Sequence, residues 1–408
     1  MFVEKTDSQI AKLIKKEERR QAETLNLIAS ENYPSKAVRE VLGSLFVSKY
    51  SEGRPYKRYY AGQENIDKLE TLVEERVRKV FGLNKNWAVN VQPYSGSPAN
   101  YAILRGLLNL NDKIMSLSLS QGGHLTHGAK VSLSGQDFKI VNYSLNKDGL
   151  LDYKEIEKLA KKEKPKLIIC GFTAYPRKID FKKFGEIAKK VRAYLLADIS
   201  HISGLIVGKI HPCPFPWADV VMTTTHKTLR GPRGAVIVCR EELKDKIFPK
   251  VFPGLQGGPH NHTIAAIGAA LKEAMTPVFK KYAAQIVKNA KTLAEELKKY
   301  NFKLISGGTD NHLILIDLTN KNITGKEAQV LLEKAGIVLN KNTIPYDPRP
   351  PFDPSGIRIG TPAVTTRGMK EKEMKKIAAW INEVIINPKS VLRVKNEIKK
   401  LCQKFPLP

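Results

Sequence analysis

The chain has 408 residues, of which 42% are hydrophobic and 26% are charged. This balance is typical of a globular protein of two or three domains, and it excludes disordered, collagen-like and disulfide-dense chains. The net charge of +28, from 68 basic and 40 acidic residues, is the one unusual value. Lysine is interleaved with glutamate on helical stretches, so we attribute the charge to solvated helix faces and expect neither a nucleic-acid nor a membrane partner. An RNA-binding function is the weaker alternative.

The first elements are helical. A helix capped by Thr6 or Asp7 runs past Ile14, and a second helix places the apolar residues from Ile66 to Val80 on one face. From there short apolar strands alternate with helices at 153–160 and 181–191, which predicts an α/β layer with a mainly parallel sheet. The expected strands are residues 88–91, 113–117, 166–170, 194–197, 219–222 and 235–239.

A glycine-rich segment, PGLQGGP at 253–259, ends this alternation. A long helix follows through Ile286 and Leu297. The remaining residues are typical of an α+β structure, with strands at 312–317 and 357–359 and an amphipathic helix from Met374 to Val384. We therefore expect an N-terminal arm (1–48), a large α/β domain (49–277) and a small α+β C-terminal domain (278–408).

The cysteines and the amino terminus bear on localisation. The four cysteines lie far apart and form no C-x-x-C pair, so neither a zinc site nor a disulfide framework is indicated. The amino terminus lacks the long apolar stretch of a signal peptide, and no run reaches the roughly 18 apolar residues of a membrane span. We expect a cytoplasmic protein.

The segment TTTHKTLRGPRG, Thr223–Gly234, places Lys227 just beyond a buried strand. Shielding a lysine from water makes its neutral amine available to attack a carbonyl. Asp198 ends another apolar strand, at the edge where open α/β sheets bind ligands. A lysine that binds the aldehyde and a carboxylate on the pyridine nitrogen form the minimal site for pyridoxal phosphate. Taken singly, the two residues have simpler explanations, as a surface lysine and a helix-capping aspartate.

Two glycine-rich segments add to this site. YSGSPAN, Tyr94–Asn100, starts a helix and offers N–H and hydroxyl donors to a phosphate, although Ser-Gly-Ser is also an ordinary helix cap. GGHLTHG, Gly122–Gly128, carries two histidines without an accompanying carboxylate or cysteine. We therefore expect an imidazole stacked on a flat ring there, and no metal.

In order and spacing, these motifs resemble those of the serine hydroxymethyltransferase family along almost the whole chain. The resemblance implies an aspartate-aminotransferase-type fold with a mainly parallel seven-stranded sheet, pyridoxal phosphate as cofactor, and a homodimer with shared active sites. It implies reversible transfer of the serine hydroxymethyl group to tetrahydrofolate, giving glycine and 5,10-methylenetetrahydrofolate. A related β-hydroxy-amino-acid aldolase or α-methylserine hydroxymethyltransferase is the alternative. Further motifs that carry the resemblance are LIASENYPS (27–35), KYSEG (49–53), KRYYAG (57–62), FPGLQGGP (252–259), SGGTDNH (306–312), LNKNTIP (339–345) and SGIRIGTPA (355–363).

The resemblance also implies the catalytic and cofactor-binding residues. Lys227 would bind the cofactor covalently, Asp198 would contact its pyridine nitrogen, and His124 would stack on its ring. His226, beside the lysine, would bear on substrate specificity. His201 would contact the phenolic oxygen of the cofactor. The phosphate would be bound by Ser95, Gly96, Ser97 and, from a partner subunit, Gly257 and Gly258.

Substrate and folate contacts follow from the same resemblance. Glu52 would face the substrate hydroxymethyl group and move a proton during transfer; the alternative is that it merely pairs with Lys57 or Arg58. Arg358 would bind the amino-acid carboxylate in a fork. The remaining substrate residues would be Ser30, Tyr50 and Tyr60, and the folate would contact Leu119, Gly123, Leu125, Asn342, Pro350, Pro351 and Phe352.

Several positions depart from the usual pattern of the family. Arg54 stands where a tyrosine is usual, Gln121 where a histidine is usual, and Thr173 where a serine is usual. Tyr56, Arg230 and Ala235 also differ. No departure removes a catalytic group, so we expect the activity to be retained. The sequence does not distinguish a folate from a modified pterin as the carrier of the one-carbon unit.

Overall fold

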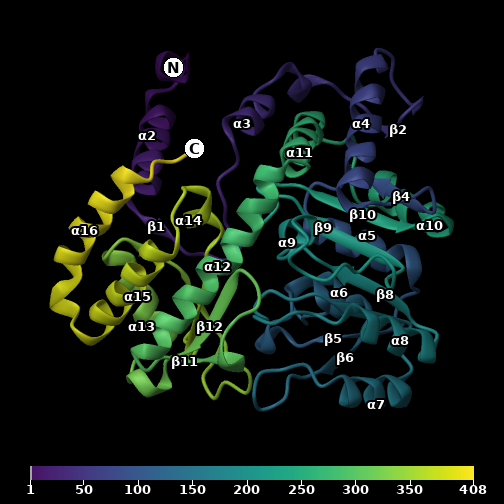
Figure 1. Cartoon of the computed structure of the whole chain (residues 1–408). Coiled ribbons are helices and arrows are strands. Elements are labelled where there is room, and N and C mark those ends of the chain that lie inside the picture. The colour runs from purple at the N-terminus through teal and green to yellow at the C-terminus, as the bar shows by residue number, and fades with distance from the viewer. Residues whose placement is uncertain (1) are drawn as a thin grey trace. The chain divides into compact units, whose positions relative to one another are not determined.

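The structure is a computed structural model that describes residues 2–408 (Figure 1). The chain divides into two compact units. We call Pro34–Ala284 the sheet unit, and we call the residues up to Tyr33 together with Gln285–Pro408 the terminal unit. The division falls inside helix α12 (Pro277–Lys299), whose start coincides with the predicted boundary, and it splits the predicted arm between the units. The three predicted domains stay a prediction.

A seven-stranded sheet organises the sheet unit, with the strand order β4-β10-β9-β8-β7-β5-β6. Strand β10 is antiparallel to both neighbours, and the pairs from β9 to β6 are parallel, so the sheet is mixed. The sequence predicted every strand except β6, an edge strand whose residues are only partly buried and not continuously apolar. The strands are β4 (Trp87–Asn90), β5 (Lys113–Leu117), β6 (Lys139–Tyr143), β7 (Leu167–Cys170), β8 (Tyr194–Asp198), β9 (Val220–Thr224) and β10 (Ala235–Arg240).

Helices cover this sheet. Asp152 and Asp180 cap two of the predicted helices by accepting hydrogen bonds from backbone N–H groups of the first turn. Helix α5 packs on β9 and β10 over one buried apolar cluster, and α8 packs on β7 and β8. A short hairpin, β2 (Gly53–Arg54) and β3 (Lys57–Arg58), precedes α4. The helices are α3 (Lys36–Leu42), α4 (Glu64–Phe81), α5 (Gly96–Leu107), α6 (Leu133–Asp137), α7 (Tyr153–Glu163), α8 (Phe181–Val191), α9 (Ser203–Val207), α10 (Lys244–Pro249) and α11 (Asn261–Ala274).

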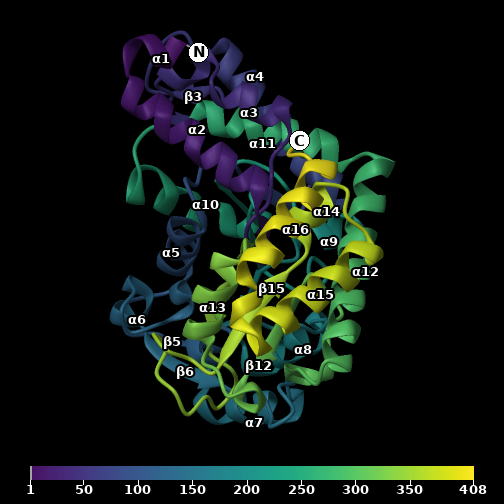
Figure 2. The ribbon, with the colours of Figure 1, turned by 90° about the vertical axis from the view of Figure 1, so that its left-hand side faces the viewer.

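The terminal unit has a four-stranded antiparallel sheet in the order β11-β12-β15-β14. Helices α13, α15 and α16 pack on one another, and Figure 2 shows α15 and α16 in yellow. Their apolar side chains form one buried cluster with those of β12 and β15. Within residues 2–408 no helix is both long and apolar enough to cross a membrane. The elements are α1 (Phe2–Thr6), α2 (Ser8–Glu23), β1 (Leu25–Asn26), β11 (Lys303–Leu304), β12 (Leu313–Asp317), α13 (Gly325–Lys334), β13 (Ile337–Val338), β14 (Asn340–Asn342), β15 (Gly356–Gly360), α14 (Pro362–Thr366), α15 (Glu371–Ile386) and α16 (Val391–Lys404).

Parallel pairing places the carboxyl ends of β5, β7, β8 and β9 at one edge of the large sheet. Asp198 is the last residue of β8, and Lys227 follows β9 at the same edge. Gly171, just after β7, has a φ of 119°, and a Cβ there would lie 1.9 Å from the backbone oxygen of Asp198. Only glycine permits this close approach, which helps to fix the backbone of the aspartate.

Candidate active site

Lys227 lies in a tight turn between β9 and β10. The Thr225 hydroxyl donates a hydrogen bond to the Pro232 oxygen over 2.6 Å, and the Thr225 N–H donates to the Gly234 oxygen over 3.1 Å. The N–H of Arg230, in the left-handed region with a φ of 63°, donates to the Lys227 oxygen over 3.0 Å. Lys227 is buried, with 9% of its surface exposed. The turn therefore fixes the lysine backbone in a place that little water reaches.

The residue after the lysine joins this turn to the loop that follows Asp198. The Thr228 hydroxyl donates to the His201 oxygen over 2.9 Å and accepts from the Gly204 N–H over 3.0 Å. A Cβ on Gly204 would lie 2.2 Å from the Thr228 oxygen, so the approach requires glycine. His201 is thereby buried next to the lysine turn.

The carboxylate of Asp198 accepts four hydrogen bonds. Its Oδ2 accepts from Asn100 Nδ2 and from His127 Nε2, each over 3.0 Å. Its Oδ1 accepts from the backbone N–H of Ser200 over 3.1 Å and from the Ser200 hydroxyl over 2.6 Å. The aspartate is therefore held rigidly at the edge of the sheet.

Electrostatics keep Asp198 ionised. Burial, the largest influence, would raise the pKa of its carboxyl, but the hydrogen bond and charge of His127, followed by His124 and Lys227, lower that pKa well below its usual range. The motifs alone did not predict a function for His127, Asn100 or Ser200. The first two lie inside the motifs GGHLTHG and YSGSPAN, but nothing in those motifs shows which side chain contacts Asp198.

A chain of hydrogen bonds connects His124 to the same carboxylate. The Nδ1 of His124 accepts from the Thr126 N–H over 3.2 Å and lies 2.8 Å from the Thr126 hydroxyl. That hydroxyl also accepts from Asn100 Nδ2 over 2.9 Å. Because Nδ1 accepts, the neutral ring carries its proton on Nε2. Thr126 thus fixes the ring orientation of His124, and Asn100 links Thr126 to Asp198.

His226, next to the lysine, is a neutral imidazole. Burial, followed by the charges of Lys227 and Arg233, lowers the pKa of His226 to about 3. Its Nδ1 is buried without a hydrogen-bond partner among the described residues. The hydroxyl oxygen of Thr224, at the end of β9, is likewise buried and unpartnered there. Such atoms are costly in a folded protein unless a ligand satisfies them.

The start of α5 has the donors that an anion requires. Ser95 is the residue before the helix, and its side chain makes no capping hydrogen bond. The first N–H groups of the helix, at Gly96 and Ser97, have no partner within the helix because of their position. A Cβ on Gly96 would lie 2.7 Å from the Thr224 methyl group, so the helix start packs directly against the end of β9. These donors therefore lie beside the strand that leads to Lys227.

Glu52 lies beside the glycine-rich segment after α10. Its carboxylate oxygen is 3.5 Å from the position of a Cβ on Gly257, and the Tyr50 ring is 3.5 Å from that of a Cβ on Gly258. The rings of Tyr50 and Tyr60 make an edge contact with centroids 5.3 Å apart. An open cavity of about 570 Å³ is lined by Glu52, Tyr59 and residues 252–257. The predicted Tyr50, Glu52, Tyr60, Gly257 and Gly258 thus gather in one region.

The alternative in which Glu52 pairs with Lys57 or Arg58 is wrong. Arg58 donates to Asp67 over 2.8 Å and to Glu70 over 2.7 Å. Within residues 2–408 the Glu52 carboxylate makes no ion pair or hydrogen bond. It therefore remains available to a substrate.

The segment expected to contact folate packs closely on β5. A Cβ on Gly123 would lie 2.1 Å from the Leu117 oxygen. Leu119 and Leu125 are exposed on either side of it. Two departures from the family have structural explanations here. The Gln121 side chain accepts from the Leu145 N–H over 2.7 Å, and the Thr173 hydroxyl donates to the Gly123 oxygen over 2.9 Å.

The other predicted residues belong to the terminal unit. Arg358 lies in β15, and its Nε donates to Asn340 Oδ1 over 3.1 Å. Burial lowers the pKa of Arg358 to about 10, so the guanidinium stays charged at neutral pH. Ser30 and Asn342 are half-buried, and the Asn342 amide donates to the Thr343 oxygen over 2.7 Å. Pro350, Pro351 and Phe352 lie in an exposed loop before β15.

Comparison with known proteins gives a consistent result. A sequence profile described as serine hydroxymethyltransferase matches residues 3–381. The serine hydroxymethyltransferase of Acidothermus cellulolyticus is 54% identical over 413 aligned residues, which cover 99% of this chain and 96% of that protein. That of Desulfotalea psychrophila is 54% identical, covering 100% and 96%, and that of Sorangium cellulosum is 55% identical, covering 98% and 95%. The chain belongs to the serine hydroxymethyltransferase family.

Proposed function

We infer that the protein catalyses the reversible transfer of the serine hydroxymethyl group to tetrahydrofolate, giving glycine and 5,10-methylenetetrahydrofolate, with pyridoxal phosphate as cofactor. The observation that carries this function is the presence, at one edge of the sheet, of a buried lysine and of an ionised aspartate that accepts four hydrogen bonds. Membership of the family supports the same reaction.

The residues of the sheet unit fit pyridoxal phosphate. Lys227 supplies the amine for its aldehyde, and the ionised Asp198 suits a protonated ring nitrogen. The start of α5 offers backbone and hydroxyl donors to its phosphate. Beside the lysine, His226 and Thr224 present buried polar atoms that have no hydrogen-bond partner within the described part of the chain. When bound, the cofactor withdraws electrons from the amino-acid Cα and so permits the bond to the hydroxymethyl carbon to break. We propose that the unit has the aspartate-aminotransferase-type fold.

The protein residues orient the substrate and move the proton. The Arg358 fork, with Ser30 and Tyr60, would grip the carboxylate of serine, because a guanidinium matches a carboxylate with two parallel hydrogen bonds. Glu52, whose carboxylate has no partner within residues 2–408, would take and return the proton of the substrate hydroxyl. The predicted set Leu119, Gly123, Leu125, Asn342 and Pro350–Phe352 would contact the folate.

Absorbance and product assays test this function together. The purified protein should show the visible band of a lysine-bound pyridoxal cofactor, and glycine and tetrahydrofolate together should shift it. Glycine formation from serine should depend on tetrahydrofolate. Folate-independent cleavage of serine, or a preference for α-methylserine, would instead identify one of the related activities on the same fold.

We also propose a cytoplasmic homodimer in which Gly257 and Gly258, with Tyr50 and Glu52, complete the site of the partner. Exposed apolar side chains on the early helices, including Leu13 and Leu45 at 61% and 89% exposure, support an interface. A Lys227 variant and a Gly258→Asp variant, each inactive, should recover partial activity when refolded together. No recovery in a mixture that contains heterodimers would refute the shared site.

A further inference from the structure

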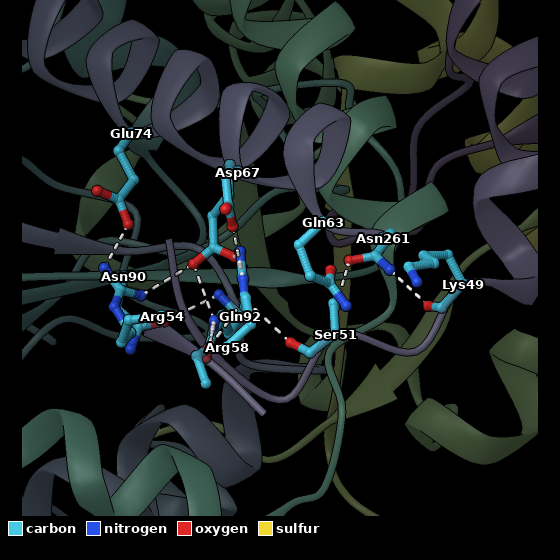
Figure 3. Close-up of polar contacts among 12 residues, drawn as sticks. Lys49, Ser51, Arg54, Arg58, Gln63, Asp67, Glu74, Asn90, Gln92 and Asn261 are labelled. Atoms are coloured by element: carbon cyan, nitrogen blue, oxygen red, sulfur yellow. Dashed lines mark hydrogen bonds and ion pairs between the residues drawn. The ribbon is translucent and has the colours of Figure 1, made fainter. Parts of the chain in front are cut away.

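The backbone that carries Glu52 is held along its length, although the Glu52 side chain is not. Five successive carbonyl oxygens, those of residues 49–53, accept a hydrogen bond. Figure 3 shows the first of these bonds, from Asn261 to Lys49. Two side chains donate to the first two carbonyl oxygens: Asn261 Nδ2 to that of Lys49 over 2.6 Å, and Gln63 Nε2 to that of Tyr50 over 2.8 Å. The backbone N–H of Tyr59 donates to the carbonyl oxygen of Glu52 over 3.2 Å.

Arg58 holds the residues on both sides of Glu52. Its Nη1 donates to the Ser51 oxygen over 3.0 Å and to the Gly53 oxygen over 2.9 Å. Its side chain is only 3% exposed. One guanidinium nitrogen therefore bridges the two carbonyls that flank the residue expected to move the proton.

Two carboxylates of α4 fix this guanidinium. Asp67 accepts from Arg58 Nε over 2.8 Å, and Glu70 accepts from Arg58 Nη2 over 2.7 Å. Glu70 is completely buried, and its other oxygen accepts from Gln92 Nε2 over 2.8 Å. Gln92 in turn donates to the Gly53 oxygen over 2.9 Å. Every guanidinium nitrogen of Arg58 thus donates a hydrogen bond. Only a planar guanidinium can reach two carboxylates and two carbonyls at once.

We propose that Arg58, held by Asp67 and Glu70, is a positioning residue that sets the place of the Glu52 carboxylate for hydroxymethyl transfer. The inference rests on the function proposed above for Glu52. Arg58 acts through the backbone, because it donates to residues 51 and 53 and not to the Glu52 side chain. Its contribution is therefore confined to reactions that need Glu52.

Arg54 provides a matched control. This arginine also donates to Glu70, over 3.1 Å, and pairs with Glu74, and it donates to the Val89 oxygen over 3.2 Å. Among the described residues 2–408, its hydrogen bonds do not reach the backbone of residues 49–53. Arg54→Met therefore removes two ion pairs from the same network and leaves the carbonyls of that backbone bonded.

The test is a double-mutant cycle on the loaded enzyme with Arg58→Lys and Glu52→Gln. Arg58→Lys keeps the charge but cannot reach all four acceptors, and a displacement of about 1 Å lowers a rate by roughly 100-fold. We expect this loss in serine-to-folate transfer, with little change in folate-independent cleavage of β-phenylserine. In the Glu52→Gln background Arg58→Lys should cause no further loss, because the group it positions is already absent.

Two further measurements separate positioning from general destabilisation. Hydrogen exchange of the peptide that contains Tyr59 should be faster in Arg58→Lys and unchanged in Arg54→Met, although both variants should unfold at a lower denaturant concentration than the unsubstituted protein. If Arg58→Lys does not fold, Gln92→Met takes its place in the cycle. This substitution removes one donor to the Gly53 oxygen, so we expect a smaller loss of folate-dependent transfer.

The outcomes distinguish this inference from the function on which it rests. If Glu52→Gln leaves folate transfer unchanged, the function proposed for Glu52 is overturned, and this inference with it. If Glu52→Gln abolishes transfer but the effects of the two substitutions multiply in the double variant, only the positioning by Arg58 is overturned. If Arg58→Lys slows serine-to-folate transfer and β-phenylserine cleavage equally, the positioning by Arg58 is likewise overturned.

Discussion

Asp198→Asn exchanges one carboxylate oxygen for an NH₂ group at a position with four donors. Each oxygen of Asp198 accepts two hydrogen bonds, so the new NH₂ group must face two donors in either orientation. The less costly orientation faces His127, whose ring can change tautomer and accept. Asn100 then loses its acceptor.

The magnitude follows from these contacts. One lost hydrogen bond to a charged, buried group costs about 1.5–3 kcal/mol of unfolding free energy. The active enzyme loses more, because a neutral amide cannot hold a ring nitrogen protonated. Removing an electrostatic group of this kind lowers the rate by roughly 10²–10³-fold or more.

Denaturant unfolding and steady-state serine-to-folate transfer measure the two effects. Ser200→Ala is the control, since it removes one hydrogen bond to Asp198, over 2.6 Å, and keeps the negative charge. Because the same hydroxyl also accepts from the Thr224 N–H over 3.0 Å, Ser200→Ala should reduce stability by at least about 1.5–3 kcal/mol, with a much smaller loss of activity. Near-normal transfer by Asp198→Asn, or equal losses for both variants, would refute the electrostatic reasoning.

The remaining predictions concern three other residues. Lys227→Gln should still bind pyridoxal phosphate but lose the covalent link that borohydride makes permanent; mass spectrometry that finds the reduced adduct on another lysine would contradict the assignment. Arg358→Lys should raise KM for serine far more than it lowers kcat, because a single ammonium replaces the fork; an unchanged KM would argue against the carboxylate contact. Burial, with a smaller contribution from Glu70, raises the pKa of Glu74 to about 6 from an ordinary 4.5. The folded protein therefore binds this proton more tightly, and about 2 kcal/mol of stability present below pH 4.5 is lost as the pH rises through about 6. Glu74→Gln should lack that decline in denaturant titrations, and an identical pH profile would exclude Glu74 as its source.

Local pattern was sufficient for most elements of this protein and for part of its site. Asp152 and Asp180 begin helices because a side-chain oxygen caps the first turn, a property of neighbouring residues. Asp198 and Lys227 follow apolar strands that are short enough to identify, and parallel pairing brings such strand ends to one edge. Their juxtaposition was therefore predictable without knowledge of any long-range contact.

Only the tertiary structure decided which side chains meet. Asn100 lies in α5, which follows β4, and His127 lies in the segment after β5. Both reach Asp198 at the end of β8, although neither β4 nor β5 neighbours β8 in the sheet. Arg58 meets Glu70, and Glu52 has no ion-pair partner within residues 2–408, although both acids are close to Arg58 in the sequence. Strand β6 was missed because its residues are only partly buried. Periodicity reports which face of an element is buried, whereas the partner of a buried polar group depends on how distant elements pack.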